Sequence, residues 1–129
     1  MIREIEEISM NAWPALQTMH YDGWVLRFAH GVTKRSNSVN PIYPSKIDAD
    51  YKINYCENLY RSQNLHPCFK ITEIVEPSGL DRKLEAHGYE HIFDIGTIIT
   101  GLVIGLIVYV VWSLFQKNLV KKFVYGMCR

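Results

Sequence analysis

The sequence predicts an α/β fold in which helices cover a mixed sheet. Segments with helical periodicity alternate with segments of period two, in the order helix, hairpin, helix, strand, helix, strand. The 129 residues are 48% hydrophobic and 12% aromatic, which is typical of a globular chain with room for one domain. These observations indicate an architecture and do not yet indicate an activity.

The first element is predicted to be an amphipathic helix over residues 2–12. Isoleucines recur at helical spacing along it: Ile2, Ile5 and Ile8. Glu4, Glu6 and Glu7 lie on the other side and are predicted to form a solvated face rather than a set of catalytic acids. Residues 15–20 then read as a short apolar helix or connector that leads to a turn at Tyr21-Asp22-Gly23.

The central element is a predicted hairpin over residues 24–43. Its first strand alternates apolar Trp24, Leu26 and Phe28 with other residues, the pattern of a half-buried strand. Gly31 marks the reversal, because glycine adopts positive φ without steric cost. Prolines soon after the return strand remove backbone donors and end it.

Two further helices and two further strands complete the predicted layout. Ser45 or Asp48 is a candidate cap for a helix that ends near residue 63, with Tyr51 and Tyr55 on its apolar face and Lys52 largely opposite. A strand is predicted over residues 68–75 and a helix over 80–87, followed by glycine at position 88. A last strand begins at residue 89 and is expected to run to 94.

Charge divides the chain into unlike parts. Residues 1–94 carry 10 Lys+Arg against 13 Asp+Glu, a net of −3, whereas residues 95–129 carry 4 Lys+Arg and no acid, a net of +4. We therefore expect three regions, which are 1–94, a hydrophobic stretch 95–115 and a basic tail 116–129. The overall net charge of +1 gives no electrostatic reason to expect a nucleic-acid partner.

The cysteines and histidines show no metal-ligand spacing. Cys56, Cys68 and Cys128 are widely spaced, so we expect reduced thiols in a cytosolic setting and no metal. His87 and His91 are four residues apart, but the glycine between them is expected to end the helix. The acidic N-terminus lacks the features of a secretory signal, which also favours the cytoplasm for residues 1–94.

A longer run of residues resembles a known family. The run comprises Asn11-Ala12-Trp13-Pro14-Ala15, Tyr21-Asp22-Gly23-Trp24, Leu26-Arg27-Phe28-Ala29, Gly31, Thr33-Lys34-Arg35, Asn37-Ser38-Val39-Asn40-Pro41 and Tyr43. It resembles the N-terminal region of a branch of the GNAT superfamily of N-acetyltransferases. The resemblance extends more loosely over residues 5–94 and then stops, which implies a partial GNAT-like fold.

The resemblance implies an enzyme that transfers the acetyl group of acetyl-CoA to an amine of a small molecule or peptide. In that superfamily a Q/R-x-x-G-x-G/A turn holds the coenzyme pyrophosphate at a helix N-terminus. This chain has no such pattern, so no coenzyme-binding residue is assigned and no catalytic residue is named. The expectation is a truncated or frameshifted N-terminal fragment, without its coenzyme half and without independent activity.

Five residues around the hairpin are candidates for substrate binding: Arg27, Lys34, Arg35, Asn37 and Asn40. Basic side chains in the turn suit an anionic substrate group or the coenzyme phosphates, and a solvated turn is the alternative. The asparagines suit orientation of a substrate, with hydrogen bonding in the turn and edge strand as the equal alternative.

The region after residue 94 has three interpretations. Ile95 to Phe115 is 21 residues without a charge, long enough to cross a bilayer as a C-terminal hydrophobic helix. The lysines that follow would place the C-terminus inside, which conflicts with a cytosolic N-terminal domain. A shifted reading frame explains the change in composition equally well, and a single buried strand of this length is too long. The alternative function is therefore a membrane-tethered, non-catalytic α/β binding domain.

Overall fold

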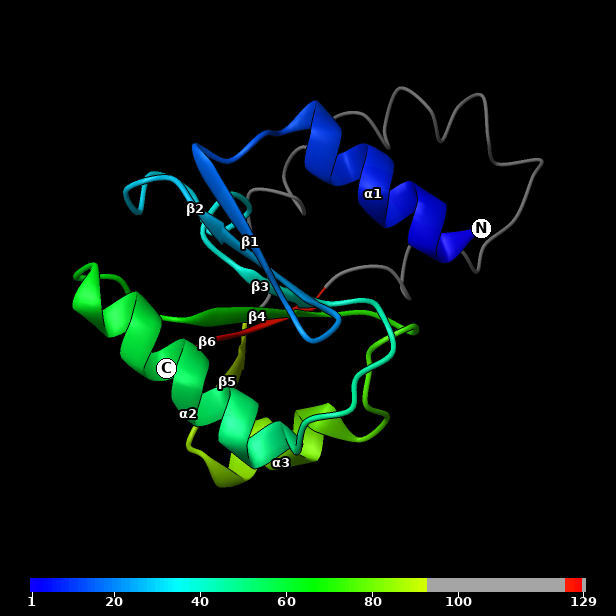
Figure 1. The fold of residues 1–129 in the computed structure, drawn as a ribbon, viewed down its shortest axis with the longest axis vertical. Coiled ribbons are helices and arrows are strands. Elements are labelled where there is room, and N and C mark those ends of the chain that lie inside the picture. Colours follow the sequence, from blue (N-terminus) through cyan, green and yellow to red (C-terminus); the bar gives the residue numbers. More distant parts are fainter. Residues whose placement is uncertain (93–124, 129) are drawn as a thin grey trace, which may run out of the picture.

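The computed structural model describes residues 1–92 and 125–128, which form three layers (Figure 1). A six-stranded sheet lies in the middle, with helix α1 on one face and helices α2 and α3 on the other. The helices are α1 Ile2–Ala12, α2 Ala49–Ser62 and α3 Leu80–Ala86. The strands are β1 Gln17–Tyr21, β2 Trp24–Phe28, β3 Val39–Pro41, β4 Cys68–Ile71, β5 Glu90–Ile92 and β6 Tyr125–Cys128.

The sheet is mixed, as the sequence predicts. Its strand order is β1-β2-β3-β4-β6-β5, and every neighbouring pair is antiparallel except the parallel pair β3–β4. A parallel pair needs a crossover between its strands, and α2 provides it. The predicted fold class, α/β with a mixed sheet, is therefore confirmed.

Strand β1 corrects the prediction of a short helix or connector over residues 15–20. It pairs with β2 around the turn at Asp22 and Gly23, whose φ angles are 40° and 80°. Positive φ at both central residues matches the right-handed twist of a two-residue hairpin, and this pairing overrides local helix preference. A Cβ at Gly23 would lie 2.3 Å from the carbonyl oxygen of Pro44, so the turn requires glycine.

The apolar core lies between the sheet and the α2/α3 layer. The Phe69 ring packs nearly perpendicular to the Trp24 ring, with centroids 5.7 Å apart, and to the Tyr89 ring at 5.3 Å. The side chains completely removed from solvent there include Trp24, Leu26, Val39, Ile53, Tyr60, Phe69, Leu80 and Leu84. Helix α2 begins where the sequence predicts. Asp48 Oδ1 caps it by accepting hydrogen bonds from the Asp50 and Tyr51 amides.

The faces of both longer helices differ from the prediction. Helix α1 turns Glu6 toward the sheet, where it is 3% exposed, and leaves Ile5 and Ile8 43% and 66% exposed. The predicted solvated face is wrong for Glu6, because the sheet beneath α1 is polar and offers it a cationic partner. In α2, Lys52 is buried and Tyr51 is exposed, which reverses the predicted assignment.

Strand β2 is buried on both faces, although its alternation predicts burial on one. Leu26 faces the core, and Val25 and Arg27 face α1, where they are also buried. The alternation of apolar and other residues along β2 therefore predicts which face of the strand meets the apolar core. It does not predict whether a helix also covers the opposite face.

Strand β6 lies between β4 and β5 and brings residues from the end of the chain into the sheet. Cys68 of β4 is opposite Cys128 of β6, and their sulfurs form a disulfide between residues 60 apart in sequence. The expectation of three reduced thiols is thus wrong for this pair. Cys56 is a free thiol buried in α2, and burial raises its pKa to about 12.

The hydrophobic stretch Ile95 to Phe115 lies outside the described residues. Within residues 1–92 and 125–128, none of the helices has the length and apolar character needed to span a bilayer. The prediction of a C-terminal hydrophobic helix therefore falls on residues outside the described ranges.

Candidate functional site

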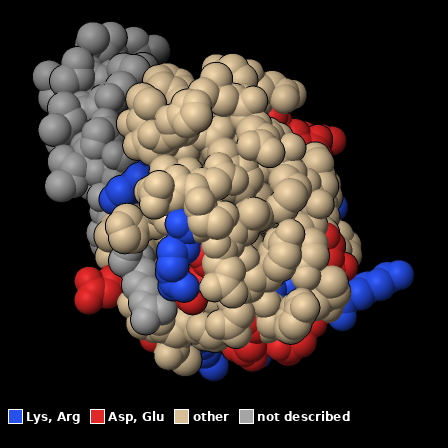
Figure 2. Space-filling model, turned by 60° about the vertical axis from the view of Figure 1, so that its left-hand side comes forward, with Lys and Arg blue, Asp and Glu red and all other residues tan. Residues whose placement is uncertain are grey.

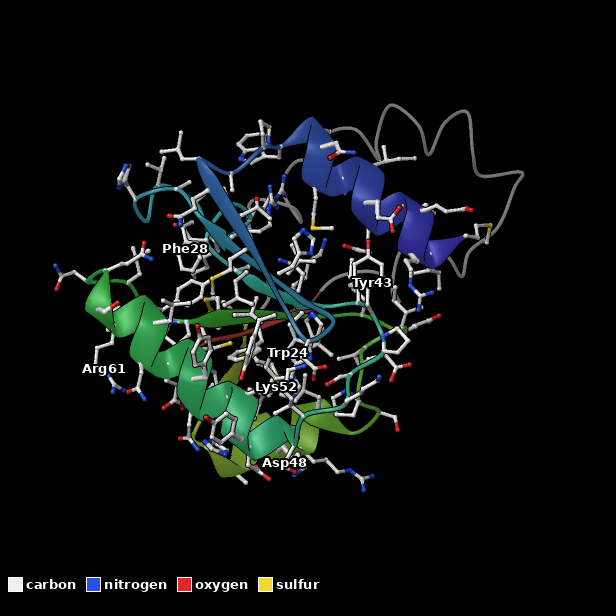
Figure 3. All side chains as sticks on the ribbon, viewed as in Figure 1. Trp24, Phe28, Tyr43, Asp48, Lys52 and Arg61 are labelled. Carbon is white, nitrogen blue, oxygen red and sulfur yellow. A yellow bond between two sulfur atoms is a disulfide. The ribbon has the colours of Figure 1, made fainter. Side chains whose placement is uncertain are left out.

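Polar contacts hold α1 on its face of the sheet. Glu6 Oε2 lies 2.5 Å from Lys70 Nζ of β4. The Tyr43 hydroxyl donates to Glu7 Oε1 at 2.6 Å, and Arg3 Nε donates to the carbonyl oxygen of Ile42 at 2.9 Å. Figure 3 shows Tyr43 pointing toward α1 from the chain that follows β3.

Arg27 joins α1 to the β2–β3 connection. Its guanidinium donates to the carbonyl oxygens of Arg35 at 2.7 Å and Met10 at 3.2 Å, and also to that of Trp13. The last turn of a helix carries partial negative charge, so the cation stabilises this end of α1. Desolvation by burial lowers the pKa of Arg27, which nevertheless stays protonated because a guanidinium titrates far above neutral pH.

A cavity of about 390 Å³ lies beside α1, and four of the described side chains that line it are cationic. These are Arg27 of β2, Lys34 and Arg35 of the β2–β3 connection, and Lys70 of β4. No acidic side chain is among the described residues that line it. The structure therefore brings three of the five predicted substrate-binding residues together and adds Lys70, which sequence reasoning missed.

The rest of the cavity wall is largely apolar. It includes Ala12 at the end of α1, Trp13 directly after it, Ile92 of β5 and the Cys68–Cys128 disulfide. The Arg35 guanidinium lies 5.9 Å from the centre of the Trp13 ring, a cation–π distance. The cavity thus combines positive charge with surface that suits an apolar group.

The two predicted asparagines lie outside this cavity. Asn37 Oδ1 accepts from the amides of Ala29 and Gly31, at 2.7 and 3.0 Å, and its Nδ2 donates to the Thr33 carbonyl oxygen at 2.6 Å. Asn37 therefore shapes the connection that carries Lys34 and Arg35.

Asn40 is buried in β3, where its Nδ2 donates to the carbonyl oxygens of Val25 and Ser38. Its Oδ1 has no hydrogen-bond partner within residues 1–92 and 125–128. Asn37 thus bonds within the connection, and Asn40 bonds within the sheet. A role of either side chain in orienting a substrate stays a prediction.

A second cavity, of about 410 Å³, lies on the same face between α1 and strands β1 and β2. Glu7, His20 and Tyr43 line it, and Arg27 lines both cavities. The hydrogen bond to Glu7 raises the pKa of Tyr43 by stabilising the protonated phenol. Among the described residues, a carboxylate lines the second cavity and none lines the first.

Lys52 is a buried titratable group that the sequence did not single out. Its Nζ lies 3.2 Å from Asp22 Oδ2, 2.7 Å from Ser45 Oγ and 4.1 Å from the centre of the Trp24 ring (Figure 3). The Ile47 amide is the main cause that holds the pKa of Asp22 well below its usual range. All donors and acceptors around Lys52 belong to the β1–β2 turn and its neighbours, so the pair is structural.

His87 and His91, four residues apart with a glycine between them, contact different carboxylates. His87 Nε2 lies 3.2 Å from Asp50 Oδ1, and His91 Nε2 lies 2.8 Å from Glu85 Oε1. Each histidine therefore faces a carboxylate of its own. In the described ranges no three His, Cys, Asp or Glu side chains are grouped so that they could hold a metal ion.

Outside the cavities the charges are mixed. On the face drawn in Figure 2, uncharged residues predominate, and basic and acidic side chains occur at separate points around them. The convergence of four cations on one cavity is thus a local feature of a domain whose residues 1–94 have a net charge of −3.

The chain belongs to the family described as "Probable histone acetyltransferase Rv0428c C-terminal", which matches residues 1–89. The resemblance seen in the sequence over residues 5–94 is therefore confirmed at the level of the family.

Two curated relatives carry acetyltransferase names. The chain is 36% identical over 91 residues to "Uncharacterized N-acetyltransferase YobR" of Bacillus subtilis, covering 70% of the chain and 36% of the relative. It is 27% identical over 99 residues to "Probable histone acetyltransferase Rv0428c" of Mycobacterium tuberculosis, covering 74% of the chain and 31% of the relative. The chain thus spans about a third of the length of these relatives, and no solved structure matches it significantly.

Proposed function

We propose that this chain supplies the substrate-side half of a GNAT-type N-acetyltransferase with a partial GNAT-like fold. In the intact enzyme a substrate amine attacks the thioester carbonyl of acetyl-CoA, the C–S bond breaks, and the coenzyme leaves as thiolate while the amine loses a proton. The observation that carries the proposal is the family match over residues 1–89, together with a relative named as an N-acetyltransferase.

The chain alone is proposed to lack activity. Its sequence has no Q/R-x-x-G-x-G/A pattern that could present backbone amides to the coenzyme pyrophosphate. The relatives are about three times as long as the matched region, which leaves room for a coenzyme-binding part outside it. Acetyl-CoA is then the co-substrate of the whole enzyme rather than a ligand of this chain.

Within that half, the cationic cavity is proposed to receive the substrate. Arg27, Lys34 and Arg35 would contact an anionic group, and Asn37 and Asn40 would keep the β2–β3 connection in shape. Support comes from the shared cavity of the three basic residues and from the internal hydrogen bonds of the asparagines.

Residues 95–129 are proposed to be either the product of a shifted reading frame or a membrane segment followed by a basic tail. The change in composition after Asp94 favours the first, and the 21 uncharged residues favour the second. Sequencing the coding DNA from about codon 90 separates them. A second frame that encodes a Gln or Arg followed by G-x-G supports the shifted frame, and its absence supports the membrane segment.

Calorimetric titration with acetyl-CoA tests the main proposal. We expect no saturable binding to this chain and saturable binding to the B. subtilis relative, which serves as the control. Micromolar binding to this chain would contradict the claim that the coenzyme half is missing. Failure of the relative to bind would contradict the assignment to acetyl transfer.

A further inference from the structure

We infer that the cavity beside α1 binds an amphiphilic anion, and that the acceptor amine of the proposed reaction carries a phosphate or carboxylate on an apolar body. The identity of the ligand as acceptor rests on the proposed function. Anion binding rests on the geometry of the cavity alone.

The charge of Arg27 is not balanced by a carboxylate among the described residues. Lys70 has a carboxylate partner in Glu6, but the three hydrogen-bond acceptors of Arg27 are all carbonyl oxygens. Arg27 is 4% exposed, and a buried cation is costly unless an opposite charge is close. The end of α1 offsets about half a unit charge. An anion in the cavity would offset the remainder.

Arg27 also has hydrogen-bonding capacity left. A guanidinium has five N–H donors, and three bonds to protein acceptors are formed in the described part of the chain. Lys34 and Arg35 are exposed and line the same cavity. A phosphate or carboxylate that enters beside these two residues can therefore reach a fixed, buried guanidinium.

The sheet supplies space for the ligand. Lys70, Gly126 and Ile92 are register partners on adjacent strands, and all three line the cavity. Gly126 has no side chain, and a Cβ there would meet Ile92 and the Phe69 carbonyl oxygen at an ordinary 3.7 Å. Glycine is thus not required for backbone fit at this position. Its effect is to keep volume open between Lys70 and Ile92.

The apolar walls of the cavity indicate the chemistry of the part of the ligand next to the anionic group. Trp13, Ile92 and the disulfide present apolar surface next to the cations. A small inorganic ion would leave that surface in contact with water, whereas an aromatic or aliphatic body would cover it. The class that fits is therefore an anion with an apolar portion.

Calorimetry of the full chain with phenyl phosphate tests the inference. We expect one-site binding, which Lys34→Gln combined with Arg35→Gln weakens about tenfold, because charge-assisted hydrogen bonds are lost. Gly126→Val, which fills the space over the sheet, should weaken binding at least as much. The control is Lys46→Gln combined with Arg82→Gln, which removes the same charge from exposed positions outside the cavity and should change affinity less than about twofold.

Absence of saturable binding, or equal weakening by the control pair, would overturn the inference. Retained affinity in a folded Gly126→Val variant would also overturn it, with folding checked by circular dichroism. Coenzyme A serves as a second probe for the source of the anion. If coenzyme A binds with the same dependence on the variants, the anion belongs to the coenzyme and the assignment to the acceptor is wrong. In that outcome the proposed lack of a coenzyme site fails too. Loss of phenyl phosphate binding alone removes the proposed role of the cavity and leaves the proposed assignment to acetyl transfer intact.

Discussion

The two faces of the sheet are built from different chemistry. The face toward α2 and α3 is apolar and closely packed, with Trp24 and Phe69 at its centre. The face toward α1 presents Arg27 and Lys70, and α1 rests on it through hydrogen bonds and an ion pair while Ile8 points to solvent. Burial on the first face stabilises the domain. The second face has two cavities and a buried guanidinium, that of Arg27, which no described carboxylate faces.

The largest effect is expected from the apolar face. Phe69→Ala removes a fully buried ring that contacts Trp24 and Tyr89, and should lower the free energy of unfolding by about 3–5 kcal/mol. Urea denaturation followed by circular dichroism measures it. A loss below about 1 kcal/mol would show that this face is not the principal core.

A smaller loss is expected from the ion pair under α1. Glu6→Gln removes the charge that faces Lys70 and should cost about 2 kcal/mol, because a hydrogen bond between charged groups becomes a weaker one. Amide hydrogen exchange should show lost protection in α1 and unchanged protection in β4. Equal loss in both elements would mean that the two faces unfold as one unit.

Acid should weaken the turn that joins β1 to β2. The pKa of Asp22 lies below its usual range, chiefly because the Ile47 amide donates to it, so the folded state favours the carboxylate. Its contribution is complete above the unfolded pKa, near 4, and is lost as pH falls below that value. The stability difference between the wild type and Asp22→Asn should therefore be largest at neutral pH and shrink below about pH 4. A difference that is constant with pH would contradict this account, and thermal melts from pH 7 to 2 measure it.

The smallest effect is expected at Ile8. Ile8→Ser changes a side chain that is 66% exposed, so the free energy of unfolding should change by less than about 0.5 kcal/mol. If the isoleucines of α1 packed on the sheet, as their spacing predicts, the same change would cost about 2 kcal/mol or more. Chemical denaturation separates these outcomes, with Phe69→Ala as the comparison.

Local signals in the sequence predicted much of the fold. The alternation from Trp24 to Phe28 and the cap at Asp48 both correspond to observed elements. The Asp22-Gly23 dipeptide is typical of a two-residue hairpin turn. The turn was predicted there, but the strand before it, β1, was predicted as a short helix or connector. These features depend on neighbours a few residues apart, and a single sequence displays such neighbours directly.

The features that failed depend on distant partners. Glu6 is buried because Lys70 lies 64 residues away in sequence, and Cys68 pairs with a cysteine 60 residues away. Lys52 is buried because the β1–β2 turn folds over it. The candidate site likewise contains residues that local sequence signals predicted and one residue that they did not. Lys34 and Arg35 were found from the turn itself, whereas Lys70 joins them only through the sheet.

Hydrogen–deuterium exchange with and without phenyl phosphate tests the central contrast between the faces most directly. The account predicts that the ligand slows exchange in α1, the β2–β3 connection and β6, and leaves α2 and α3 unchanged. Slowed exchange in α2 and α3, or no change anywhere at saturating ligand, would contradict the assignment of binding to the polar face.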